Sequence, residues 1–275
     1  MRDSAYLRLE FMILNARCNI AYDIKEDVAA IFMLRPRSGS AQTVMAEEFI
    51  FQPPVPMVEF IDGYGNLCQR TIMPAGKFEV SVKYEVKVDD RVDADLNAPL
   101  TPVQDLPPDV VQFLLPSRYC QSDQLAEMAQ GIVADVAPCY LQAQTIRDWV
   151  HREISYVSDS SNASTAALDT LESREGVCRD FSHLGIALCR AMSIPARMAV
   201  GFLHELKPMD LHAWFEAFIG GRWWTFDATQ AETKGNRIVI AFGRDAADVA
   251  LATIFGEFVM DSMSVSVEAV ASQDI

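Results

Sequence analysis

The feature that most constrains the fold is a nearly continuous apolar run within residues 176–195, which begins at Phe181, three residues after Cys178. From Phe181 onward the run is apolar almost all the way round at helical spacing, which predicts a buried central helix. Pro195 ends this helix because proline has no amide hydrogen to donate. Cys178 then lies in the first turn, where the helix dipole and the unpaired amides favour a thiolate over a thiol. The alternative is that Cys178 is a small buried hydrophobe, the usual state of a cysteine in an apolar helix.

Two aromatic-rich runs on either side of Gly220 and Gly221 predict a tight β-hairpin over residues 211–229. Glycines supply the positive φ angles that such turns need. If the two glycines form the loop, counting outward places His212 and Asp227 on one face of the hairpin as diagonal neighbours. Diagonal neighbours lie about 7–8 Å apart along the backbone and within reach by side chain. The hairpin therefore brings an imidazole beside a carboxylate.

A cysteine at a helix start and a histidine oriented by an acid are the groups that nucleophilic acyl transfer requires. The histidine accepts the thiol proton, the acid holds the tautomer of the histidine, and the thiolate attacks a carbonyl to give a thioester. The sequence thus predicts a thiol enzyme that acts on acyl groups.

Four sequence blocks also resemble a known family. They are Gly-Val-Cys-Arg-Asp-Phe-Ser-His-Leu, Ile-Pro-Ala-Arg with Val-Gly-Phe, His-Ala-Trp-Phe-Glu-Ala-Phe, and Trp-Trp-Thr-Phe-Asp-Ala-Thr. In this order, over about residues 140–230, they resemble the transglutaminase-like superfamily of papain-like thiol enzymes. The resemblance implies Cys178 as nucleophile, His212 as base and acid, and Asp227 as the orienting acid. Ser193 departs from the family, which usually has glycine before Ile-Pro, and this leaves the end of the helix open.

The rest of the chain predicts an α+β protein in which an antiparallel β-sandwich precedes the papain-like, transglutaminase-like core. Short alternating or apolar runs fill residues 1–95, and the clearest period-two strand begins at Phe78. This region resembles the N-terminal β domain of bacterial transglutaminase-like proteins, and we expect a structural or substrate-orienting module. Four prolines among the eleven residues 98–108 predict a linker over residues 96–108. Residues 109–275 then form the thiol domain.

Within the thiol domain the periodicity predicts two helices before the central one. The first starts at residue 123 with Ser122 as its cap, and the second covers residues 141–154 and packs beneath the central helix. A strand over residues 196–203 leads into the hairpin. Later strands are predicted over residues 237–242, 249–254 and 258–270, and the last of these is expected to complete the sheet of the thiol domain.

Composition restricts the partners and the location. The chain has 38 acidic and 23 basic residues, a net charge of −15, which repels nucleic acid and anionic membrane surfaces. We therefore expect a peptide or protein substrate, with no nucleic-acid or membrane partner. The six cysteines have no paired spacing and are predicted to be free thiols of a reducing compartment. With no signal peptide or membrane span in the sequence, the cytoplasm is the expected location.

Other side chains have two interpretations each. Tyr156 is either a group that helps to stabilise an oxyanion or, as we favour, a buried tyrosine with a bonded hydroxyl. Trp214 is predicted to form a wall of the substrate cleft, although packing is the commoner role of such aromatic residues. His183 is expected to be a core or capping histidine. Since no His-x-x-x-His, Cys-x-x-Cys or phosphate-binding glycine loop occurs, we expect neither a metal nor a cofactor.

The sequence therefore predicts a cysteine protease, amidase or transglutaminase-like acyltransferase that acts on amide bonds of peptides or proteins. Hydrolysis is favoured over protein cross-linking, although the triad itself does not separate the two outcomes. The alternative is a non-catalytic peptide-binding scaffold that keeps the transglutaminase-like fold.

Overall fold

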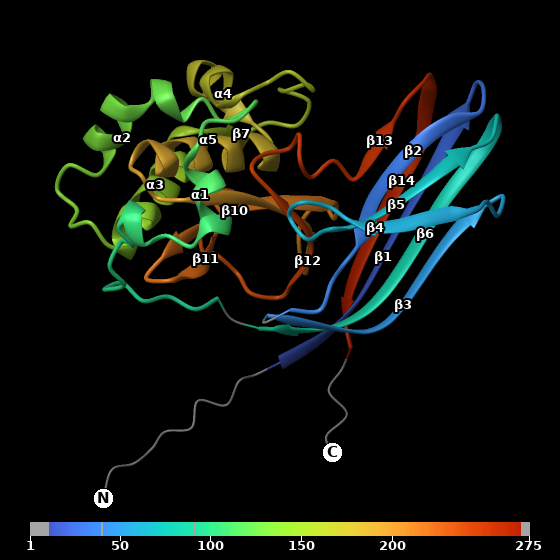
Figure 1. Ribbon diagram of the computed structural model, residues 1–275, viewed down its shortest axis with the longest axis horizontal. Coiled ribbons are helices and arrows are strands. Elements are labelled where there is room, and N and C mark those ends of the chain that lie inside the picture. Colours follow the sequence, from blue (N-terminus) through green and yellow to red (C-terminus); the bar gives the residue numbers. More distant parts are fainter. Residues whose placement is uncertain (1–10, 40, 91, 271–275) are drawn as a thin grey trace, which may run out of the picture.

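A computed structural model describes residues 11–39, 41–90 and 92–270. Figure 1 shows a β-sandwich on one side of the molecule and a helix-covered sheet on the other, an α+β arrangement. The sandwich consists of two antiparallel four-stranded sheets, with strand orders β14-β1-β6-β3 and β13-β2-β5-β4. Its strands are β1 (Phe11–Ile24), β2 (Val28–Arg35), β3 (Gln42–Gln52), β4 (Met57–Ile61), β5 (Leu67–Met73), β6 (Gly76–Asp89), β13 (Ala252–Ile254) and β14 (Phe258–Ala269).

The sandwich forms because its long strands bury every second side chain. In β6, Phe78, Val80 and Val82 are almost fully buried and the residues between them are more exposed, as the period-two pattern predicts. β1 follows the same alternation and pairs with β6 along its whole length. The alternating run that the sequence shows from Tyr6 lies partly outside the described residues.

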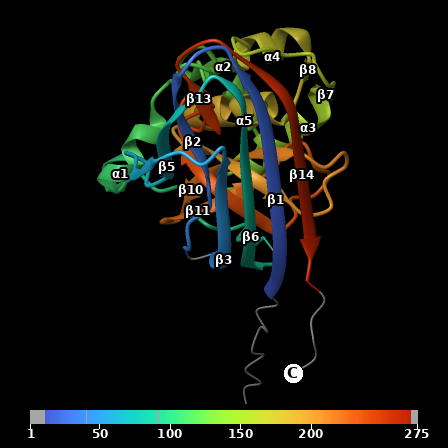
Figure 2. The ribbon, with the colours of Figure 1, turned by 90° about the vertical axis from the view of Figure 1, so that its right-hand side faces the viewer.

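The last strand among the described residues, β14, lies in the sandwich and not in the sheet that lies near Cys178. A strand is present at β14 as predicted, but it pairs antiparallel with β1, from Leu14 with Ala269 to Ile24 with Phe258. Figure 2 shows β14, β1, β6 and β3 side by side. β13, shorter than the strand predicted over residues 249–254, pairs with β2. This corrects the prediction that the strand over residues 258–270 completes the sheet of the thiol domain. Both β13 and β14, which belong to the predicted thiol domain, pair with N-terminal strands.

The part of the molecule that contains Cys178, called the thiol region below, is built on an antiparallel sheet of order β11-β10-β9-β12. Its strands are β9 (Ala196–Leu203), β10 (Leu211–Ile219), β11 (Arg222–Phe226) and β12 (Arg237–Gly243), and a short parallel pair is formed by β7 (Ser155–Tyr156) and β8 (Glu175–Gly176). The helices are α1 (Pro108–Val111), α2 (Ala126–Ile132), α3 (Tyr140–Glu153), α4 (Ala167–Ser173) and α5 (Cys178–Ala191), with 3-10 turns at Val103–Asp105, Gln112–Leu114 and Ser122–Gln124. Ser122 begins one of these 3-10 turns and does not cap α2 with its side chain, which corrects the predicted start of that helix. No helix in the described ranges is long and apolar enough to cross a membrane.

α5 is the predicted central helix, and it packs closely against β10. A Cβ added at Gly185 would lie 2.6 Å from the Phe215 ring, so the glycine permits the approach of helix to sheet. The helix ends at Ala191, and Ser193 adopts a left-handed φ of 58°, the conformation for which glycine is favoured. The amide of Ile194 donates to the carbonyl of Cys189 at 3.0 Å and closes the helix end. Serine therefore takes the glycine position of the family without extending the helix.

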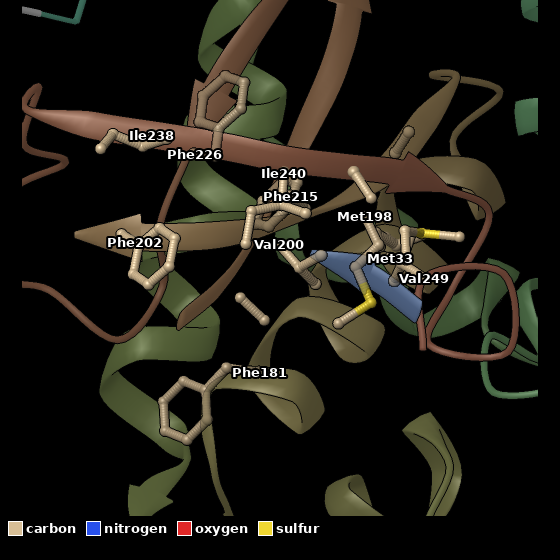
Figure 3. Close-up of a cluster of buried hydrophobic side chains, with 14 of the residues drawn as sticks. Met33, Phe181, Met198, Val200, Phe202, Phe215, Phe226, Ile238, Ile240 and Val249 are labelled. Carbon is tan, nitrogen blue, oxygen red and sulfur yellow. The ribbon is translucent and has the colours of Figure 1, made fainter. Parts of the chain in front are cut away.

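One hydrophobic core joins the two halves of the molecule. Figure 3 shows Met33 of the sandwich near Met198 and Val249 of the thiol region. Two buried amide side chains of the sandwich also bond to the backbone of β12: Gln42 bonds to Val239, and Asn66 bonds to the N–H and the carbonyl of Phe242 at 2.9 and 2.8 Å. The sandwich is thus fixed to the edge of the thiol sheet.

Candidate active site

The predicted hairpin brings His212 and Asp227 into direct contact. Gly220 and Gly221 have φ angles of 60° and 82°. Ile219 pairs with Arg222, and the pairing continues to Phe215 with Phe226, as counting outward from the two glycines predicts. His212 Nε2 lies 2.8 Å from Asp227 Oδ2. Both side chains are almost fully buried, at 3 % and 0 % exposure, so the contact is shielded from water.

Asp227 is held as a carboxylate by four hydrogen bonds. Its Oδ2 accepts from Arg237 Nη2 at 2.8 Å besides the contact with His212, and its Oδ1 accepts from the amide and the hydroxyl of Thr229 at 3.0 and 2.7 Å. Burial alone would raise the pKa of Asp227, but the Arg237 charge and these hydrogen bonds hold this pKa far below its ordinary value. The site therefore contains a permanent buried negative charge.

That charge makes His212 strongly basic. Burial lowers the pKa of His212, but the hydrogen bonds to Asp227 and Cys178 and the charges of both partners outweigh it and raise the pKa from 6.5 to about 9. Because Nε2 contacts Asp227, Nδ1 is the ring nitrogen left for the Cys178 thiol. The three side chains thus form one continuous chain of contacts.

Cys178 is the first residue of α5, in the turn that the sequence predicts. The preceding amide, of Val177, donates to Asp180 Oδ2 at 2.9 Å, and the Cys178 carbonyl accepts from Ser182 Oγ at 2.8 Å. Cys178 is partly exposed, whereas four of the other five cysteines are buried. This position combines access to solvent with the positive end of a helix.

Comparisons with known proteins show which family the chain belongs to. The model of the "Transglutaminase-like superfamily" matches residues 126–228, a range that includes all three side chains. A crystal structure described as a "Putative Cysteine Protease" from Cytophaga hutchinsonii is 37 % identical, covers 97 % of this chain and 93 % of its own, and superposes with a TM-score of 0.89. The chain belongs to the transglutaminase-like superfamily.

Curated relatives of this transglutaminase-like protein also occur in mycobacteria. The uncharacterized protein ML0607 of Mycobacterium leprae is 27 % identical over 233 residues, which is 79 % of this chain and 82 % of the relative. The uncharacterized protein Rv2569c of Mycobacterium tuberculosis is 27 % identical over 250 residues, 78 % of this chain and 77 % of the relative. The match to these proteins therefore extends well beyond the thiol region.

Tyr156 lies beside Cys178 and is not buried. It is 55 % exposed, which corrects the prediction that it is a buried tyrosine. Partial burial raises the pKa of Tyr156, as does the nearby Cys178, while a hydrogen bond with the Cys178 backbone opposes this shift. The phenol ring packs against Phe181 of α5, with 6.0 Å between the ring centroids. Tyr156 thus presents its hydroxyl at the start of α5.

Trp214 lies behind His212. It is 1 % exposed, its ring stacks near that of His212 with centroids 6.1 Å apart, and the Arg237 guanidinium lies over it at 4.8 Å. A side chain so buried presents no surface to a substrate at Cys178, which corrects the prediction that Trp214 forms a wall of that cleft.

Two residues that bond to Asp227, Arg237 and Thr229, were not predicted from the sequence to belong to the site. A signal for Arg237 was present, since an arginine opens the otherwise apolar run over residues 237–242 and a buried arginine requires an acidic partner. His183, by contrast, is a core histidine as predicted: it is 0 % exposed and stacks on Tyr119 at 5.0 Å. In the part of the chain that the structure describes, no group of His, Cys, Asp or Glu is arranged to hold a metal ion.

Proposed function

We propose that this transglutaminase-like protein is a thiol-dependent enzyme that cleaves amide bonds of peptides or proteins through a thioester on Cys178. The observation that carries the proposal is the 2.8 Å contact between buried His212 and Asp227, next to a partly exposed cysteine at a helix start. A scaffold that only binds peptides would not need a histidine whose pKa is raised to about 9 by an acid and a thiol.

Each group has a defined role in the proposed reaction. His212 Nδ1 takes the proton of the Cys178 thiol, and the sulfur attacks the carbonyl carbon of the amide. When the carbon–nitrogen bond breaks, the His212 imidazolium gives its proton to the leaving amine. Water, deprotonated by His212, then attacks the thioester and releases a carboxylic acid and the free thiol. Asp227 stays ionised throughout and holds the imidazole orientation.

Hydrolysis is the outcome we propose in preference to cross-linking. Both outcomes share the thioester, and they differ in whether water or a second amine accepts the acyl group. The crystal structure that is 37 % identical to this chain is described as a "Putative Cysteine Protease", which supports the hydrolytic outcome.

Tyr156 is the substrate-binding residue of this proposal. Its exposed hydroxyl interacts with the backbone of Cys178, near the place where the oxygen of a bound carbonyl would develop negative charge. The proposed location is the cytoplasm, because all six cysteines, each within the described ranges, are free.

The proposal is tested with a library of unmodified peptides, incubated with the protein and a small primary amine and analysed by mass spectrometry. We expect cleaved peptides that have gained water, and far fewer that have gained the amine. Cys178→Ala must abolish both products, whereas Cys139→Ala, a change in the other partly exposed cysteine, must leave them unchanged. Product formation by the Cys178→Ala protein would refute the proposed nucleophile.

A further inference from the structure

The inner face of the β-sandwich is open to solvent at β14. This strand ends its sheet and pairs with β1 on one side, and no described strand pairs with its other side. Residues directly opposite each other on paired strands point to the same face of a sheet. Three apolar residues of β14 lie opposite buried residues of β1 and therefore point to the inner face. They are Phe258, Met260 and Met263, opposite Ile24, Tyr22 and Ile20.

These three side chains, called the β14 strip below, are exposed although they point inward. Phe258 is 45 % exposed, Met260 51 % and Met263 38 %. The facing sheet ends in β13, which has 3 residues against 12 in β14, so part of β14 has no described strand across from it. Exposed apolar side chains that lie together indicate a binding surface. The backbone N–H and C=O groups on the free side of β14 can pair with an added strand.

Asp210 connects the inner face of β14 with the candidate active site. It is exposed and lies in the loop between β9 and β10. Burial raises the pKa of Cys18, which pairs with Val265 of β14, and the charge of Asp210 raises this pKa further. Partial burial and Cys178 raise the pKa of Tyr156, and the charge of Asp210 adds to that shift as well. Since the effect of a charge falls with distance, Asp210 lies near both residues.

Figure 2 agrees with this connection. It shows β14 as the outer strand of its sheet, on the side of the view where β7, the strand of Tyr156, also lies. A chain that lies along β14 and continues past Asp210 therefore leads towards Cys178.

The charge of Asp210 favours a basic group. Among the described residues no Lys or Arg pairs with Asp210, whose Oδ1 accepts only from the backbone amide of Leu211 at 2.7 Å. Asp261 of β14, by contrast, is already paired with Lys77 at 2.9 Å. The chain as a whole has a net charge of −15, which attracts cationic groups. A Lys or Arg side chain of a substrate is therefore the group that Asp210 is placed to bind.

We propose that β14 binds an extended, apolar segment of the polypeptide substrate as an added strand, and that a basic residue next to this segment binds to Asp210. Every second side chain of the added strand would point to the β14 strip. The inference rests on the proposed function, because it names the substrate class of that site: unfolded or loosely held chains in which a basic residue adjoins an apolar segment. It also gives the β-sandwich a role in selecting the substrate.

Binding is measured with the Cys178→Ala protein, so that the result does not depend on turnover. The probe is a fluorescein-labelled peptide in which isoleucine alternates with threonine and lysines flank both ends, and its fluorescence anisotropy gives the dissociation constant. We expect saturable binding, and at least about tenfold weaker binding of a peptide with serine in place of isoleucine. No saturable binding, or equal binding of the two peptides, would overturn the proposal.

Two neighbouring residues of β14 provide matched variants. Met260→Ser changes the β14 strip, and we expect about fivefold weaker binding of the isoleucine peptide from the lost apolar contact. Val259 is 62 % exposed and points to the opposite face, so Val259→Ser should leave binding unchanged. Equal effects of the two changes would overturn the assigned surface. Sedimentation provides a further check, because a dimer that Met260→Ser dissociates would show that a second copy of the chain covers β14 and would overturn the proposal.

The charge contact is tested at Asp210. Asp210→Asn keeps the oxygen that accepts from Leu211 but removes the charge, and we expect about threefold weaker binding of the lysine-flanked peptide at low salt. A peptide with glutamine in place of lysine should show no such loss. Glu205→Gln, which removes an exposed acid from the same loop, should leave binding unchanged. Equal losses for the two peptides, or no loss for either, would overturn the role of Asp210.

Turnover separates this inference from the proposed function. With a library peptide that the unsubstituted protein cleaves and that contains the apolar and basic pattern, Met260→Ser should raise KM about fivefold and leave kcat unchanged. Cleavage with an unchanged KM would overturn the inference and leave the proposed function intact. Peptide binding without any cleavage by the unsubstituted protein would refute the proposed function alone.

Discussion

Replacement of Asp227 by asparagine tests the electrostatics of the candidate site through protein stability. The asparagine would keep the shape of the side chain but leave the buried charge of Arg237 without its acidic partner, so we expect a loss of about 3–5 kcal/mol in the free energy of unfolding. The loss should also depend on pH. Because the pKa of His212 is raised from 6.5 to about 9 in the folded state, protonation of His212 stabilises the fold. This contribution is fully present below pH 6.5 and disappears as the pH rises through 9.

The contribution of His212 to the free energy of unfolding depends on pH. With the folded and unfolded pKa values of about 9 and 6.5, the contribution of His212 falls by about 2 kcal/mol between pH ~6 and pH ~8.5. Without the Asp227 carboxylate most of this contribution is absent. The deficit of Asp227→Asn relative to the unsubstituted protein should therefore shrink by about 2 kcal/mol over that range.

Urea unfolding at the two pH values measures this deficit. Asp245→Asn is the matched control, since Asp245 is also buried, at 1 % exposure, but accepts hydrogen bonds from the backbone amides of Tyr119 and Ala247 and has no contact with His212. Its deficit should be the same at both pH values. An Asp227→Asn deficit that is equally independent of pH would refute the argument that Asp227 raises the pKa of His212.

Three further changes test how the fold supports the site. Gly185→Ala places a methyl group against the Phe215 ring and should lower the free energy of unfolding by about 1–3 kcal/mol, and an unchanged urea midpoint would show that the close approach is not required. Ser193→Gly relieves the left-handed φ and should raise the melting temperature, by a stabilisation of about 1 kcal/mol, whereas a lower melting temperature would contradict the assigned helix end. Asn66→Ala leaves the N–H and carbonyl of Phe242 unpaired and should cost about 1–3 kcal/mol, measured by urea unfolding, and no loss would show that this amide does not fix the sandwich to β12.

The contact between His212 and Asp227 could be predicted because it depends on local geometry alone. Glycines at Gly220 and Gly221 fix the loop, the loop fixes the register, and the alternation of side chains fixes which residues share a face. The position of Cys178 is local as well, since it follows from the pattern of one helix. Nothing outside these two segments was needed.

Long-range pairings could not be predicted in the same way. The alternation of β14 predicts a strand but is compatible with either sheet, and only the assembled fold shows that β14 pairs with β1. Arg237 lies on β12, outside the hairpin that carries Asp227. The contact between the two residues therefore depends on where β12 joins the sheet. The exposure of Trp214 and Tyr156 was also predicted wrongly. Their roles were predicted from residue type, whereas their burial depends on the elements that pack around them.

The most direct test of the proposed nucleophile is the rate at which iodoacetamide labels each cysteine at pH ~6, where ordinary thiols are almost entirely protonated. Cys139, the other partly exposed cysteine, is an internal control with comparable access to the reagent. We predict that Cys178 is labelled at least about tenfold faster than Cys139 and that His212→Ala removes the difference, because the imidazole no longer takes the thiol proton. Labelling of the two cysteines at equal rates in the unsubstituted protein would contradict the account.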